Sequence, residues 1–227
     1  MHTVAFGPSM ITTPDRFWDD SGAGISTSAP VGRATSLLYP QKKRLNWPSS
    51  TNSKKNDPEF EMIVRKETNA DIDVITDVTI AAFLTLPISN HTEQYIINAL
   101  RAAGVLTISL VAEIDGRVVG HIAFSPVTIS NGEKDWYGLG PISVLPEYQR
   151  QGIGKTLVNE GLSLLKELGG QGCALVGDPN YYKRFGFHNF PELVHEGIPQ
   201  EVFLALPFTE KVPQGIVVFH KGFLANG

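Results

Sequence analysis

Two glycines separated by one residue follow a predicted strand and open a predicted helix. The strand ends near Leu145, and the segment after it reads Gln149-Arg-Gln-Gly-Ile-Gly-Lys155. The first N–H groups of a helix have no partner within the helix, and the helix dipole adds about half a positive charge there. Glycine has no Cβ, so a ligand can approach the backbone closely. Because Arg150 and Lys155 add full charges, residues 149–155 are predicted to bind a phosphate or diphosphate.

Three glycine-loop motifs compete for this segment. The dinucleotide motif G-x-G-x-x-G fails, because Leu157 occupies the position of its third glycine. The nucleotide P-loop matches at Gly154-Lys155-Thr156, but Gln149 replaces its first glycine and the strands before it look antiparallel. The third motif, Q/R-x-x-G-x-G/A, is matched at Gln149, Gly152 and Gly154. A glycine turn that merely starts a helix is a further alternative.

The third motif is where the chain resembles the GNAT superfamily of acyl-CoA-dependent acetyltransferases, over about residues 61–227. Two segments carry the resemblance together: Val144-Leu-Pro-Glu-Tyr-Gln-Arg-Gln-Gly-Ile-Gly154 and Tyr182-Lys-Arg-Phe-Gly-Phe187. Residues 138–144 and the Gly177-Asp-Pro stretch look most like a bacterial-type branch called predicted N-acetyltransferases. The resemblance implies an α/β (α+β) fold, in which helices flank a central, mostly antiparallel and splayed sheet.

The resemblance also implies the site residues. In the family, the freed backbone of the fourth strand bonds the pantetheine arm and the acetyl carbonyl of acetyl-CoA, and a later tyrosine protonates the departing thiolate. The match places the tyrosine at Tyr182, with Tyr181 as the alternative. The positions assigned to acetyl-CoA are Ile142, Ser143, Val144, Gln149, Arg150, Gln151, Gly152, Ile153, Gly154, Lys155 and Asn180. Asn180 could equally cap the turn in which it lies.

The residue that would deprotonate an attacking amine is not identified by sequence. Many GNAT enzymes carry an acid on the fourth strand, whereas this chain has apolar residues and glycine at positions 139–142. Glu113, His121 and Tyr137 lie on strands that could reach the site, but each is also an ordinary strand residue. Cys173 lies in a short apolar strand, where a free cysteine usually behaves as a small hydrophobe. We therefore assign only Tyr182 a catalytic role.

The elements that must position these residues follow from hydrophobic periodicity and turn chemistry. Asp115-Gly116 between two β-rich runs predicts a tight hairpin. The predicted strands are 62–65, 107–114, 117–130, 136–145, 173–176, 202–206 and 216–220. Helices are predicted after residue 68, around residues 96–100, from the glycine loop to about 168, and over 179–185.

Composition divides the chain near residue 60. Residues 1–60 carry seven Lys or Arg against five Asp or Glu, and they show no sustained hydrophobic period. We interpret this segment as a disordered or low-complexity extension, because it buries too little apolar surface to offset its ordering entropy. Residues 61–227 then hold 12 basic and 18 acidic side chains, from 19 − 7 and 23 − 5. The folded part is acidic, so anion binding there must be local.

Composition also excludes several classes of protein. A net charge of −4 argues against a nucleic-acid footprint, and the single cysteine excludes an intrachain disulfide framework. No apolar run has the ~18 residues that a membrane span needs, and the histidines show no metal-ligand spacing. We expect a cytoplasmic monomer or homodimer that acetylates a small-molecule or peptide amine. The alternatives are a non-catalytic acyl-CoA-binding regulatory module and, more remotely, a P-loop NTPase.

Overall fold

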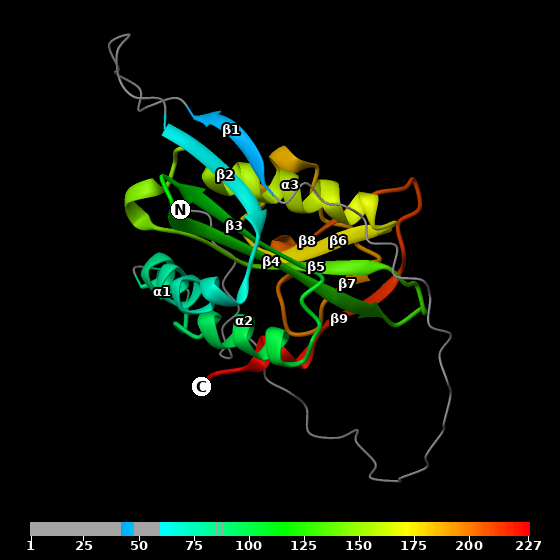
Figure 1. Cartoon of the computed structure of the whole chain (residues 1–227). Coiled ribbons are helices and arrows are strands. Elements are labelled where there is room, and N and C mark those ends of the chain that lie inside the picture. The colour runs from blue at the N-terminus through cyan, green and yellow to red at the C-terminus, as the bar shows by residue number, and fades with distance from the viewer. Residues whose placement is uncertain (1–41, 48–59, 85, 88) are drawn as a thin grey trace, which may run out of the picture.

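The computed structural model describes residues 42–47, 60–84, 86–87 and 89–227. These residues form a nine-stranded sheet flanked by helices, shown in Figure 1. The strands are β1 (Lys43–Trp47), β2 (Phe60–Lys66), β3 (Ile108–Ile114), β4 (Arg117–Ile129), β5 (Trp136–Val144), β6 (Gly172–Val176), β7 (Leu193–Val194), β8 (Phe203–Pro207) and β9 (Gly215–Phe219). The main path runs β1-β2-β3-β4-β5-β6-β8, and β9 pairs with β4 and β7.

Most neighbouring strands along this path are antiparallel, as predicted. The hairpin between β3 and β4 turns at Asp115 and Gly116, whose φ angles of 50° and 78° are the positive values that a type I′ turn needs. Only the pair β5–β6 on the main path is parallel, because α3 (Ile153–Glu167) crosses over between these two strands. Both segments that flank the glycine loop, β5 and α3, therefore form as the sequence pattern predicts.

Strand β1 corrects one expectation. It lies inside the segment that the sequence predicted to be disordered, yet Lys43–Trp47 pairs with β2 in antiparallel register. The edge of β2 offers free backbone groups, and backbone pairing needs no hydrophobic period in the added strand. Lys43 also forms an ion pair with Glu160 on α3. The rest of residues 1–60, apart from Lys42 and Phe60, lies outside the described residues, so the domain boundary stays a prediction.

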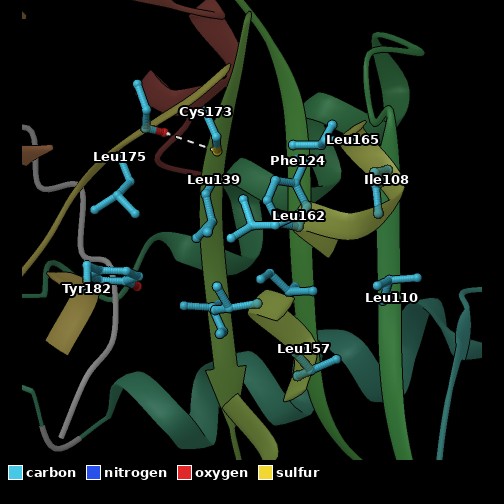
Figure 2. Packing of buried hydrophobic residues seen from close by; sticks show 14 of the residues in the cluster. Ile108, Leu110, Phe124, Leu139, Leu157, Leu162, Leu165, Cys173, Leu175 and Tyr182 are labelled. Carbon is cyan, nitrogen blue, oxygen red and sulfur yellow. Dashed lines mark hydrogen bonds between the residues drawn. The ribbon is translucent and has the colours of Figure 1, made fainter. Parts of the chain in front are cut away.

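The helices cover the two faces of the sheet, as Figure 1 shows. Helices α1 (Ile72–Phe83) and α2 (Glu93–Ala102) lie on one face, and α3 lies on the other. Alternation along β4 sorts its side chains between these faces. A Cβ on Gly120 would contact Ile153 and Leu157 of α3, and the ring of Phe124 packs against Gly161 of the same helix. Figure 2 shows Phe124 in this core beside Leu162 and Leu165.

Strands β5 and β6 diverge at the centre of the sheet. They pair only at Trp136–Gly138 with Gly172–Ala174, although β5 continues to Val144 and β6 to Val176. The register between β4 and β5 also shifts between Ile122 and Phe124. Among the described residues, the second half of β5 therefore has a strand partner on one side alone. This is the splayed sheet that the resemblance implied.

Candidate functional site

The start of α3 presents backbone N–H groups that no helical carbonyl satisfies. The N–H of Thr156 donates to Gly152 O at 2.9 Å, so the amides of residues 153–155 precede the first intrahelical bond. Arg150 and Gly152 have φ angles of 61° and 93°, which turn the loop sharply into the helix. The helix dipole favours a negative charge at this point. The loop can therefore hold an anion through backbone groups.

A pocket of about 310 Å³ opens against this helix start. Its walls come from the end of β5, the glycine loop, the first turn of α3 and the α4 region (Pro179–Tyr182 and the turn after it). The lining residues are Ile142, Val144, Tyr148, Gln149, Arg150, Gly152, Ile153, Gly154, Lys155, Tyr181 and Arg184. Eight of these were assigned to acetyl-CoA from the sequence, so the structure brings that set together around one cavity.

Three assigned residues point elsewhere. The hydroxyl of Ser143 lies 3.2 Å from Thr79 Oγ1 on α1, across the sheet from the pocket. The side-chain amide of Gln151 donates to Glu147 O on the exposed surface. Asn180 is exposed, and its backbone N–H donates to the Asp178 side chain, so it belongs to the cap of α4. None of the three lines the described pocket.

Backbone N–H and C=O groups along β5 point alternately towards β4 and away from it, which leaves two N–H groups available as donors. The N–H of Leu145 donates to Val119 O at 2.9 Å, so Leu145 faces β4 and Ser143, two residues earlier, faces it too. Ile142 and Val144 then direct their N–H and C=O groups away from β4, towards the open side of the splay. The Gln149 side chain donates to Val144 O at 3.0 Å, which ties the glycine loop to the strand.

The two tyrosines of α4 occupy different environments. Tyr181 lines the pocket, and its hydroxyl lies 3.0 Å from the place that a Cβ on Gly154 would occupy. The guanidinium of Arg184 lies 4.7 Å from the centre of the Tyr181 ring. Tyr148, Tyr181 and Arg184 are pocket residues that the sequence reasoning did not assign. The sequence pointed to Tyr181 only as the alternative to its neighbour Tyr182.

Tyr182 does not line the pocket; it is completely buried, and Figure 2 shows it below Leu175. Its hydroxyl has no hydrogen-bond partner among the described residues. Burial raises the pKa of Tyr182 well above its ordinary value of 10.0, so the phenol is neutral at pH 7. A Cβ on Gly177 would lie 2.6 Å from the ring, which explains the glycine after β6. A buried donor without a partner among the described residues therefore lies near the end of β6.

The other residues considered as catalytic candidates, Cys173, Glu113 and Tyr137, lie in different environments. Cys173 is fully buried and burial raises the pKa of its thiol, which opposes formation of a nucleophilic thiolate. Glu113 is held by Arg65 at 2.8 Å, and burial raises the pKa of Tyr137.

Within the described part of the chain, no His, Cys, Asp and Glu cluster could hold a metal ion. No helix of that part is long and apolar enough to cross a membrane.

The geometry makes a prediction for Gly154. A change to alanine would place a methyl group in the pocket, 3.0 Å from the Tyr181 hydroxyl. The φ angle of Gly154 is not in the left-handed region, so alanine can adopt the same backbone conformation. For the CoA ligand that the resemblance implies, we expect the Kd to rise about tenfold, which is about 1.4 kcal/mol. Isothermal titration calorimetry measures this change. Asn159→Ala, on the exposed side of the same helix, is the control, and equal Kd values for both variants would contradict the prediction.

Comparison with known proteins agrees with this geometry. The model of the acetyltransferase (GNAT) family matches residues 74–187, which is half of the chain. The crystal structure of a GNAT family acetyltransferase from Brucella melitensis in complex with acetyl-CoA is 50% identical, with a TM-score of 0.64. The match covers 71% of this chain and 97% of that one. The chain belongs to the GNAT acetyltransferase family.

Within the family, the chain is similar to YhbS. The crystal structure of YhbS from Escherichia coli in complex with CoA is 31% identical, with a TM-score of 0.69, over 77% of this chain and 98% of that one. At the sequence level, the uncharacterized N-acetyltransferase YhbS of Escherichia coli K12 is 40% identical over 109 residues. That match spans 48% of this chain and 65% of the relative. The predicted family and fold are thus confirmed, and the P-loop alternative is wrong.

Proposed function

We propose that the protein transfers an acetyl group from acetyl-CoA to a primary amine by direct attack of the amine on the thioester. The observation that carries this proposal is one continuous arrangement. The pocket joins the unpaired amides at the start of α3 to the open backbone at the end of β5. Acetyl-CoA has a diphosphate, an amide-containing arm and a thioester, in that order. The amides at the start of α3 and the open backbone of β5 suit the first two of these groups, and the resemblance assigns Tyr182 to the thioester.

The glycine loop is suited to the diphosphate. Arg150 and Lys155 line the pocket beside the amides of residues 153–155, so full charges and oriented dipoles converge there. The chain is acidic overall, so this binding depends on local groups rather than on net charge. Structures of relatives in complex with acetyl-CoA or CoA support the same ligand.

The open side of β5 is suited to the thioester. An N–H from Ile142 or Val144 would donate to the acetyl oxygen as negative charge builds on it during attack. Removing one such donor costs about 3–4 kcal/mol in other enzymes. Pro141 has no N–H, so the donor must follow it on the strand.

Tyr182 is suited to the departing thiolate. Full proton transfer from a phenol of pKa ~10 to a thiol of pKa ~8.5 is uphill by about 2 kcal/mol in water. Donation of a hydrogen bond as charge builds on the sulfur avoids that cost. A buried hydroxyl without a partner is destabilising, and a sulfur acceptor would satisfy it. Tyr182 thus keeps the catalytic role given by the resemblance, while Tyr181 forms the pocket wall.

A non-catalytic acyl-CoA-binding module is the second candidate, favoured by the absence of an acid at positions 139–142. A thiol-release assay with acetyl-CoA and a panel of primary amines separates the two. We expect CoA release that depends on the amine and that fails with neutral analogues of the same shape. Thermal stabilisation by CoA without release for any amine would favour the binding module. We propose further that the acceptor is a small molecule or peptide and that the protein acts in the cytoplasm as a monomer or homodimer.

A further inference from the structure

Arg184 is a positively charged residue of the pocket wall that the proposed diphosphate site does not use. Arg150 and Lys155 belong to the glycine loop and to the first turn of α3, whereas Arg184 lines the same pocket from the turn that follows α4. Arg184 is exposed, so it lies where the pocket opens to solvent. The pocket therefore has a second cationic wall, at its outer edge.

Two contacts with Tyr181 hold the guanidinium of Arg184 in place. The Nε of Arg184 donates to Tyr181 O at 2.9 Å, and its Cζ lies 4.7 Å from the centre of the Tyr181 ring. Burial raises the pKa of Tyr181 above its ordinary value of 10.0, so the phenol is neutral at pH 7 and does not neutralise the cation over its ring. Because the side chain is already ordered, a ligand that binds it loses less affinity to side-chain immobilisation.

The outer edge of this guanidinium is available to a ligand. Among the described residues, Nη1 and Nη2 have no hydrogen-bond partner, and no acid forms an ion pair with Arg184. The two nitrogens present parallel N–H groups, whose geometry matches two oxygens of one phosphate. Arg184 is therefore suited to a phosphate group rather than to a neutral part of a ligand.

Other charged side chains show how Arg184 differs from an ordinary surface cation. Arg65, Arg101 and Arg117 each form an ion pair with a carboxylate of the protein. Lys183 precedes Arg184 in the sequence and is also exposed, but it does not line the pocket. Arg184 thus combines a fixed position, a place on the pocket wall and the lack of an acidic partner within the described part of the chain.

CoA carries two phosphate groups that are separate from each other. One is the diphosphate, to which Arg150, Lys155 and the amides of residues 153–155 are suited. The other is a monoester on the 3′-oxygen of the ribose; with a second pKa of about 6, it carries about 1.5 to 2 negative charges at pH 7. With the diphosphate at the start of α3, the nucleotide continues away from the thioester. Arg184, at the outer edge of the pocket, is the lining cation that remains for it.

We propose that Arg184 binds the 3′-phosphate of the CoA nucleotide and so selects the phosphorylated cofactor over its 3′-dephospho form. This inference rests on the proposed function, which names acetyl-CoA as the ligand. Nη1 and Nη2 donate to two oxygens of the phosphate, while Nε keeps its bond to Tyr181 O. The 3′-phosphate lies far from the thioester in the cofactor, so Arg184 should contribute to binding and not to kcat.

Isothermal titration calorimetry with CoA and with 3′-dephospho-CoA tests this subsite. We expect the wild type to bind CoA about tenfold more tightly than dephospho-CoA. Arg184→Gln should raise the Kd for CoA about tenfold and leave the Kd for dephospho-CoA unchanged, so that the preference disappears. A general distortion of the pocket would weaken both ligands equally. The ratio of the two Kd values therefore reports on the 3′-phosphate alone.

Two further variants separate charge from geometry. Arg184→Lys keeps the charge without the planar fork, so it should retain only part of the preference. Lys183→Gln is the matched control, because it removes a neighbouring cation that does not line the pocket, and it should keep the wild-type ratio. The preference should also weaken as salt is added, because Arg184 is exposed.

Equal Kd values of the wild type for CoA and dephospho-CoA would overturn the subsite. An Arg184→Gln variant that weakens both ligands to the same extent would overturn it as well. A wild type that binds neither ligand would instead remove the proposed function, and the subsite with it. A preference that depends on Arg184, without thiol release from acetyl-CoA with any amine, would support the subsite and contradict the acetyl transfer.

Discussion

Tyr182→Phe is expected to lower kcat for amine-dependent CoA release by about 10²- to 10³-fold. The change removes one oxygen from a fully buried side chain, and that oxygen has no hydrogen-bond partner among the described residues. Loss of an unsatisfied buried hydroxyl costs no folding free energy, and it can stabilise the protein by about 1 kcal/mol. The expected signature is therefore low activity in a protein that is at least as stable as the wild type.

Steady-state thiol release and urea unfolding measure the two halves of this prediction. The Kd for CoA should stay close to the wild-type value, because Tyr182 does not line the pocket. Tyr95→Phe, on the outer side of α2, is the matched control. A full kcat in Tyr182→Phe would disprove the role of Tyr182. If Tyr181→Phe lost kcat instead, the two adjacent tyrosines would exchange roles.

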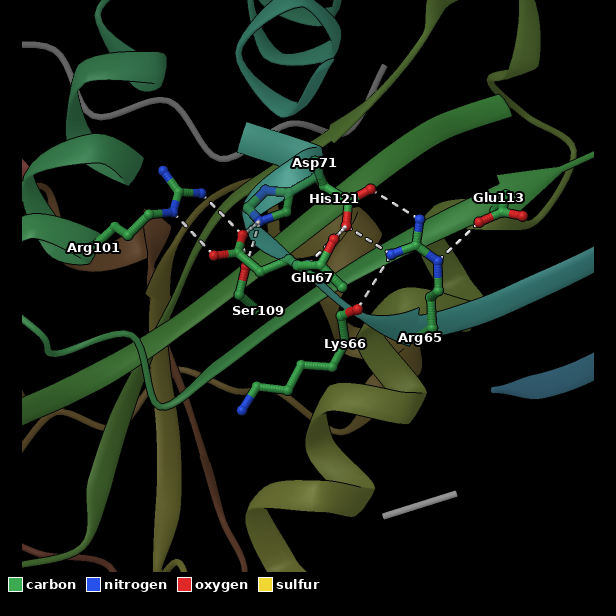
Figure 3. Close-up of polar contacts among 9 residues, drawn as sticks. Arg65, Lys66, Glu67, Asp71, Arg101, Ser109, Glu113 and His121 are labelled. Carbon is green, nitrogen blue, oxygen red and sulfur yellow. Dashed lines mark hydrogen bonds and ion pairs between the residues drawn. The ribbon is translucent and has the colours of Figure 1, made fainter. Parts of the chain in front are cut away.

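Arg65→Met is expected to lower the free energy of unfolding by about 3–5 kcal/mol. Arg65 binds both oxygens of Asp71, at 2.7 and 2.8 Å, and Glu113 at 2.8 Å, as Figure 3 shows. The side chains are only 14%, 7% and 15% exposed, respectively. Methionine keeps much of the packing but leaves two carboxylates without their shared cation. Breaking a buried pair is costly because the remaining charge is uncompensated.

The pH dependence gives this prediction a second readout. The hydrogen bonds from Arg65 lower the pKa of Asp71 from 3.8 to about 2. Stability from a depressed carboxyl pKa is present above the unfolded value and is lost as the pH falls to the folded value. The difference between wild type and Arg65→Met should therefore shrink by roughly 2 kcal/mol between about pH 4 and pH 2.

Urea unfolding at a series of pH values measures both effects. Arg117→Met is the matched control, because the Arg117–Glu147 pair is 58% and 55% exposed and should contribute at most about 1 kcal/mol. Equal losses in the two variants at pH 7 would contradict the importance of the buried network. A pH-independent difference would show that Arg65 acts through packing alone.

Much of the fold could be predicted, because its signals are local. The Asp115-Gly116 turn, the periodicity of the helix after Gly154 and the strand before Leu145 each depend on residues close in sequence. Strand β1 could not be predicted in the same way. Its residues pair through backbone groups with an edge that exists only once β2 and β3 have formed.

The sequence by itself determined the family, the glycine loop and the candidate cofactor residues around it, because an anion-binding helix start needs only a few adjacent residues. Tertiary structure decided what requires distant contacts. It placed Tyr181 on the pocket wall and Tyr182 away from it, and it turned Ser143 away from the pocket. It also joined Glu67, which follows β2, to Ser109 on β3 and His121 on β4. Hydrogen-bond direction and burial depend on which chain segments meet, and periodicity along one segment carries no information about that.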